Sequence, residues 1–156
     1  MGARPQGLCV LTGRPPPTVA SMGTLIVGYV PTAQGDAALA TGIEEARRRG
    51  HRIVVVNTAR GGEVSGPLVV QGEARSRLDA VLATSGLEHE VRQPLRGREP
   101  AEEIADAADE TGADLVVIGM RHRSPVGKLI LGSAAQQILL EVSCPVLAVK
   151  ASYDRR

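Results

Sequence analysis

The sequence predicts an α/β protein with a single parallel sheet that is covered by helices on both faces. Short runs of aliphatic, β-branched residues alternate along the chain with amphipathic segments of helical length, and this alternation is typical of right-handed β-α-β units. The length of 156 residues and the 43% hydrophobic content fit one domain with one core. In an open sheet of this kind, ligands bind beyond the carboxyl ends of the strands, where the winding direction reverses.

The first half of the chain supplies two strands and two helices to this pattern. Thr24–Gly28 is a β-branched apolar run that ends in a turn signal, which indicates a buried strand. A helix is expected from about Asp36, with Gly50 placed to end it. Arg52–Asn57 is a second apolar strand, and Val70–Ser85 is a second helix. The expected buried faces of these helices consist of Leu39, Ile43 and Ala46, and of Ala74, Leu78, Val81 and Leu82.

The second half continues the same alternation. Leu87–Gln93 alternates polar and apolar residues, which suits an edge strand with one exposed face. Pro100 stands at a first-turn position and opens a third helix. Asp114–Ile118 and Val146–Val149 are apolar strands, separated by a fourth helix over 132–142. The expected buried faces of these helices consist of Ala101, Ile104, Ala105 and Ala108, and of Ala135, Ile138, Leu139 and Val142.

Composition limits both the domain organisation and the classes of partner. Residues 1–22, rich in Gly, Pro and Arg, are expected to be a flexible leader, residues 23–150 one domain, and residues 151–156 a tail. With 18 Lys and Arg against 17 Asp and Glu, nothing favours general binding to nucleic acid or to a membrane surface. No apolar run is long enough for a membrane span, and the leader lacks a signal-peptide core. We therefore expect a cytoplasmic protein.

Catalytic and metal-binding motifs are missing from the sequence. Walker and Rossmann glycine patterns and the Gly-x-Ser-x-Gly elbow do not occur. The histidines have no metal-ligand spacing, and the two cysteines form neither a disulfide framework nor a metal knuckle. We therefore expect no enzymatic activity and no metal site. The residues in question are His51, His89, His122, Cys9 and Cys144.

The strongest local signal is the stretch from Gly119 to Ser133, in which a strand leads into a glycine-containing basic loop and then a helix. Free N–H groups at a helix N-terminus favour a phosphate, and Gly132 would let it approach without a Cβ in the way. The alternative is that Ser133 caps its own helix and the loop cations are solvated. Those cations are Arg121, His122, Arg123 and Lys128.

The chain after its leader resembles the universal stress protein family. The resemblance rests on Val117-Ile118-Gly119, a thirteen-residue step to Gly132-Ser133, an amphipathic helix, and the closing run Cys144 to Val149. It implies a three-layer α/β/α fold of the adenine nucleotide α hydrolase-like type, with a five-stranded parallel sheet of order 3-2-1-4-5. It also implies a homodimer joined through the last strand, and a regulatory role in the stress response rather than turnover.

The ATP-binding branch of that family carries a Gly-x2-Gly-x9-Gly-[Ser/Thr] loop and an Asp at the end of the first strand. Gly119, Gly132 and Ser133 match this pattern, whereas His122 replaces the second glycine and Val30 stands at the Asp position. The lost polar anchor is worth about 0.5–1.5 kcal/mol when neutral and more when charged, which weakens binding by about tenfold to a hundredfold. The resemblance thus implies weak binding of ATP or another adenine nucleotide, with Mg²⁺ as a companion, or no binding. The candidate binding residues are Gly28, Val30, Pro31, Thr58, Gly119, Arg121, His122, Gly132 and Ser133.

Several alternatives stay open at this point. The same fold could act as a dimeric interaction module that binds no nucleotide. A nucleotide hydrolase is a third reading, although no base or metal cluster is evident for it. Tyr29 could stack on a ligand base or pack under a helix. Asn57, like Thr58, ends the second strand and could line the adenosine side of the site.

Overall fold

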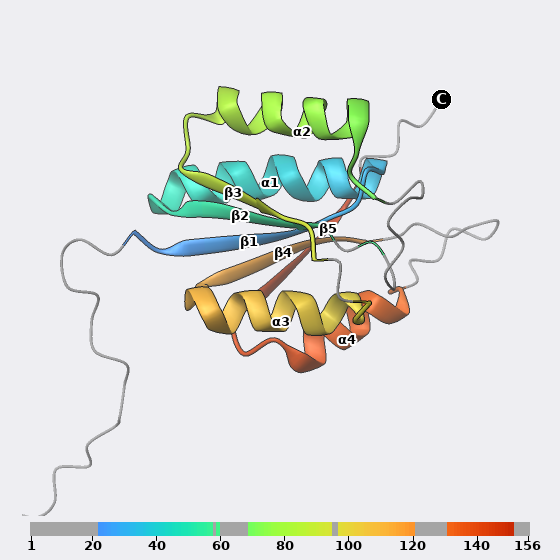
Figure 1. Ribbon diagram of the computed structural model, residues 1–156. Coiled ribbons are helices and arrows are strands. Elements are labelled where there is room, and N and C mark those ends of the chain that lie inside the picture. The colour runs from blue at the N-terminus through green and yellow to red at the C-terminus, as the bar shows by residue number, and fades with distance from the viewer. Residues whose placement is uncertain (1–21, 58, 60–68, 95–96, 121–130, 152–156) are drawn as a thin grey trace, which may run out of the picture.

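The computed structural model describes residues 22–57, 59, 69–94, 97–120 and 131–151. Strands and helices alternate strictly along these residues (Figure 1), which confirms the predicted α/β class. The strands are β1 (Thr24–Tyr29), β2 (Arg52–Asn57), β3 (His89–Arg92), β4 (Leu115–Met120) and β5 (Val146–Lys150). The helices are α1 (Ala33–Arg49), α2 (Gly72–Ser85), α3 (Pro100–Thr111) and α4 (Ser133–Glu141).

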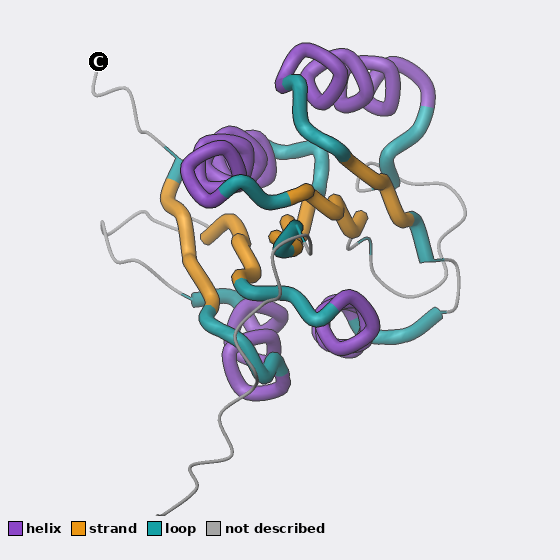
Figure 2. Tube along the Cα trace, turned by 90° about the vertical axis from the view of Figure 1, so that its left-hand side faces the viewer, coloured by secondary structure: helices purple, strands orange, loops and turns teal. Residues whose placement is uncertain are grey.

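The sheet has the order β3-β2-β1-β4-β5, and every neighbouring pair is parallel, as the resemblance implied. Figures 1 and 2 show α1 and α2 on one face and α3 and α4 on the other. Each face has its own apolar cluster, one around Leu25 and Val27 and the other around Ile26 and Val116. Neighbouring residues of one strand point to opposite faces, so β1 serves both clusters.

The ends of the helices follow from local chemistry. α1 begins at Ala33, earlier than expected, because the Thr32 hydroxyl accepts a hydrogen bond from the Gly35 N–H at 3.2 Å. Gly50 ends α1 in the left-handed conformation, with φ of 65°, as predicted. α3 begins at Pro100, as predicted, and the Glu102 carboxylate accepts a hydrogen bond from the Glu99 N–H at 3.3 Å.

Two expected core positions are wrong. Val81 and Leu139 have exposed fractions of 47% and 44%. α2 buries only Leu78 and Leu82, and α4 only Ala135 and Ile138. Only part of the apolar face of each helix packs against the sheet, and the remaining apolar side chains face outward.

β3 is shorter than expected, at His89–Arg92, but it lies at the edge of the sheet, as predicted. Its exposure does not alternate as expected, because its first two residues are exposed and its last two are half-buried. None of the helices among the described residues combines the length and the apolar character that a membrane span requires.

Candidate functional site

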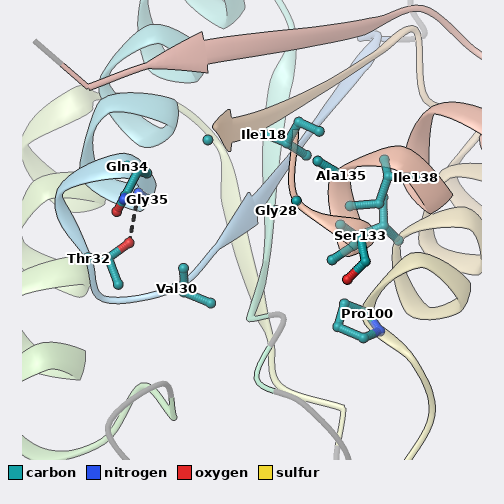
Figure 3. Close-up of a pocket in the computed structure, with 14 residues that line it drawn as sticks. Gly28, Val30, Thr32, Gln34, Gly35, Pro100, Ile118, Ser133, Ala135 and Ile138 are labelled. Atoms are coloured by element: carbon teal, nitrogen blue, oxygen red, sulfur yellow. Dashed lines mark hydrogen bonds between the residues drawn. The ribbon is translucent and has the colours of Figure 1, made fainter. Parts of the chain in front are cut away.

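A cavity of about 290 Å³ opens at the carboxyl ends of β1 and β4. These strands are neighbours in the sheet, but the chain leaves β1 for α1 on one face and approaches α4 on the other. The helices diverge at this reversal and leave a crevice. Figure 3 shows its lining, which we call the β1/β4 pocket. Its residues are Gly28, Val30, Thr32, Gln34, Gly35, Pro100, Ile104, Ile118, Gly119, Gly132, Ser133, Ala134, Ala135 and Ile138.

Five of the residues predicted from the sequence lie in this one pocket. Gly28 and Val30 come from the end of β1, Gly119 from β4, and Gly132 and Ser133 from the start of α4. The sequence separates these segments by about a hundred residues, and the parallel sheet brings them together.

Of the other four predicted residues, one lies outside the lining and three lie outside the described residues. Pro31 is the central residue of a tight turn in which the Thr32 N–H donates to the Val30 carbonyl at 2.8 Å, and it lies outside the lining. Thr58, Arg121 and His122 lie outside the described residues, as do the loop cations Arg123 and Lys128.

On the α1 side, the pocket is shaped by backbone rather than by side chains. A Cβ added to Gly119 would lie 2.3 Å from the Gln34 carbonyl oxygen, and one added to Gly35 would lie 1.8 Å from the Val30 carbonyl oxygen. The first turn of α1 can press this closely against the ends of β1 and β4 only because both positions are glycine.

On the opposite side, the first turn of α4 faces the pocket. Gly132, which has no side chain, occupies the N-cap position, and Ser133 is the first helical residue. The alternative in which Ser133 caps its own helix therefore does not apply. The first N–H groups of a helix lack intrahelical partners and carry partial positive charge, so this end favours an anion.

The remaining lining is mainly apolar. The side chains of Val30, Pro100, Ile104, Ile118 and Ile138 supply most of it, and Figure 3 places Pro100 next to Ser133 on the α3/α4 side. No titratable side chain occurs in the lining as far as the described residues define it. Within the same residues, no group of His, Cys, Asp and Glu could hold a metal ion.

Tyr29 packs inward under α1 rather than into the pocket. It has an exposed fraction of 5%, belongs to the apolar cluster on the α1 face, and donates a hydrogen bond from its hydroxyl to Asp36 Oδ1 at 2.9 Å. Burial, together with this hydrogen bond and the nearby Asp36 charge, raises the pKa of Tyr29 to about 12. Of the two interpretations of Tyr29, the structure supports packing under a helix.

Asn57 does not line the pocket either. Its exposed fraction is 3%. The side-chain amide donates from Nδ2 to the Tyr29 carbonyl at 3.0 Å, and Oδ1 accepts from the Val70 N–H at 3.2 Å. Asn57 therefore joins the end of β1 to the segment that leads into α2.

Cys144 precedes β5 and packs against the apolar cluster on the α3/α4 face. Burial raises the pKa of its thiol, with the charges of Asp114 and Asp109 acting in the same direction. A thiol with a raised pKa is a poor nucleophile at neutral pH, which agrees with a packing role.

The sequence and the fold match those of known proteins. A model of the universal stress protein family matches residues 22–150. The chain belongs to this family. A universal stress protein of Mycolicibacterium smegmatis is 47% identical over 127 residues, which cover 81% of this chain and 96% of that protein.

Solved structures of universal stress proteins superpose on the chain. One from Archaeoglobus fulgidus has a TM-score of 0.64 and 32% identity, covering 83% of this chain and 98% of the other. A structure of the universal stress protein from the same organism in complex with dAMP has a TM-score of 0.63 and 28% identity, and the match covers 82% of this chain and 97% of the other.

Proposed function

We propose that this chain is a regulatory protein of the stress response that binds an adenine nucleotide, ATP in the first instance, in the β1/β4 pocket. The observation that carries the proposal is that Gly28, Val30, Gly119, Gly132 and Ser133 converge on one cavity. Membership of the universal stress protein family and the dAMP complex of a relative at 28% identity support it.

Within the pocket, the phosphates would lie at the start of α4. The N–H groups of its first turn would donate to phosphate oxygens, Gly132 would permit close approach, and the Ser133 hydroxyl would add a donor. The nucleoside would then lie against Val30 and the apolar side chains opposite. Mg²⁺ fits such a site as a companion of the phosphates, since it commonly keeps water and phosphate ligands rather than a protein cage.

The affinity is expected to be low. Val30 is half-buried in the lining and offers neither a donor nor an acceptor from its side chain. The missing hydrogen bond to the ligand lowers the affinity by about tenfold to a hundredfold, since a charged partner such as Asp contributes more than a neutral one.

The proposed role is binding rather than turnover. The described lining supplies no side chain that could act as a general base. We therefore propose that bound nucleotide is held as a signal in a cytoplasmic protein that is not an enzyme.

A dimer through β5 is part of the same proposal. β5 is an edge strand, and its residues Val146–Val149 are only half-buried. Leu140 on α4, the helix that precedes β5 in the chain, has an exposed fraction of 85%. An unpaired edge of this kind is commonly covered by another chain. The same surface favours the second candidate function, a dimeric interaction module without a nucleotide.

Thermal unfolding with and without millimolar ATP and Mg²⁺ tests the binding proposal. A ligand that binds only the folded state raises the apparent stability by RT ln(1 + [L]/Kd). No shift, with no nucleotide retained through purification, would favour the interaction module. Steady phosphate release that a single pocket substitution abolishes would instead show an enzyme. A monomer mass in light scattering would contradict the proposed dimer.

A further inference from the structure

The last residue of β1 is held by a side chain of the neighbouring strand β2. Pairing of β1 with β4 stops at Gly28 and Ile118, one residue before β1 ends, while pairing with β2 runs on to Tyr29 and Asn57. At that last pair, the buried Asn57 amide donates to the Tyr29 carbonyl at 3.0 Å.

This contact lies immediately before the pocket wall. Val30 follows Tyr29 and lines the β1/β4 pocket, while its own carbonyl accepts from the Thr32 N–H and lies against Gly35 at the start of α1. The direction in which the chain leaves β1 is therefore set by the Tyr29 carbonyl on one side of Val30 and by the turn into α1 on the other.

The same side chain also fixes a distant segment. Asn57 Oδ1 accepts the Val70 N–H at 3.2 Å, across thirteen positions of the sequence. Val70 has an exposed fraction of 2% and precedes α2, and it does not line the pocket. One amide thus connects the pocket wall with the start of α2.

We infer that Asn57 is a positioning residue of the β1/β4 pocket, one that touches no ligand but sets the Val30 wall through the Tyr29 carbonyl and couples it to the start of α2. This inference rests on the proposed nucleotide binding. The proposed role of Asn57 requires both halves of the amide, because a donor must face Tyr29 while an acceptor faces Val70.

The Asn57→Asp variant tests the donor and the acceptor of the amide separately, because the protonation state of the introduced carboxyl depends on pH. The carboxylate keeps the acceptor for Val70 but loses the donor to Tyr29. Once protonated, the carboxyl regains an O–H donor for the Tyr29 carbonyl while its other oxygen still accepts from Val70. Because the position is buried, the pKa of the introduced carboxyl is expected above its usual range, which brings this rescue within reach of a mildly acidic buffer.

The experiment is a calorimetric titration of ATP with Mg²⁺ into wild type, Asn57→Asp and the similarly sized Asn57→Leu over a series of pH values. At about pH 8.5 the Asp variant should bind about tenfold more weakly than wild type, and towards about pH 5.5 it should approach the wild-type affinity. Asn57→Leu, which has no donor at any pH, should stay weak throughout. Dividing the affinity of each variant by the wild-type affinity in the same buffer cancels the effect of pH on the groups that all the proteins share.

Leu82→Ala is the control for stability alone, because Leu82 is fully buried in α2 and does not line the pocket. Its affinity relative to wild type should not change with pH. An Asp variant that binds like wild type at about pH 8.5, or that follows Asn57→Leu at every pH, would overturn the inference.

Hydrogen exchange on the wild type tests the coupling even if the variants do not fold. Saturating ATP should slow exchange of the Val70 N–H by at least about threefold, because binding stabilises the wall to which Asn57 connects it. Unchanged exchange would contradict the inference. If the wild type binds no adenine nucleotide, the proposed function is overturned, and the inference with it. If the wild type binds but substitutions of Asn57 leave the affinity unchanged, only the inference is overturned.

Discussion

Replacing Gly119 by Ala should close the β1/β4 pocket from its α1 side. The new Cβ would lie 2.3 Å from the Gln34 carbonyl oxygen and 2.6 Å from its carbonyl carbon, both backbone atoms of the first turn of α1. Ordinary contact begins at 3.4 Å, so β4 and α1 must move apart by about 1 Å, and overpacking on this scale destabilises by about 1–3 kcal/mol.

The displacement should also reduce ligand binding. Gln34 and Gly35 both line the pocket, and Gly35 lies against the Val30 carbonyl, so a shift of α1 moves the Val30 wall as well. Urea unfolding measures the loss of stability, and calorimetric titration with ATP should show affinity reduced by about tenfold or more.

Leu82→Ala is the matched comparison for Gly119→Ala. It should lower the unfolding free energy by about 2–5 kcal/mol through a cavity under α2 and leave the ATP affinity unchanged. If Gly119→Ala kept wild-type stability and affinity, the close approach of Gly119 to Gln34 would not shape the pocket, and the reasoning would be refuted.

Two further predictions concern residues at the carboxyl end of β1. Val30→Asp combined with His122→Gly restores the family pattern and should raise ATP affinity by about tenfold in calorimetry; equal or weaker binding by a folded double variant would count against the pocket assignment. Tyr29 has its pKa raised to about 12 in the folded state from 10.0, so the unfolded state loses this proton first and the stability falls as the pH rises through that window. The slope is at most about 1.4 kcal/mol per pH unit. Urea unfolding from about pH 9 upward should show a shallower decline for Tyr29→Phe than for wild type, and identical slopes would contradict the buried hydroxyl.

The strands and helices were predictable because their signals are local. Apolar runs such as Arg52–Asn57 are found as strands at the same positions, and Gly50 and Pro100 mark the helix ends that were expected of them. The order of the sheet is different in kind, since it depends on which strands pair over long distances. It came from the family resemblance rather than from the periodicity.

The pocket was predictable where it consists of strand ends and the start of α4. Its other wall was missed because Pro100 and Ile104 enter it from α3, and their place depends on how that helix lies across the sheet. Thr32 was missed as a cap, and the role of Asn57 could not be read from its position alone. A polar residue that ends an apolar strand signals a buried hydrogen bond but does not identify its partners.

The two walls of the pocket differ in how freely evolution or design can alter them. On the side of α1 the boundary consists of backbone against glycine, so almost any replacement there collides with main chain. On the side of α3 and α4 the boundary consists of ordinary side chains such as Ile104 and Ile138, which can be exchanged for larger, smaller or polar ones. Ligand preference in this scaffold can therefore diverge through one wall while the other stays fixed.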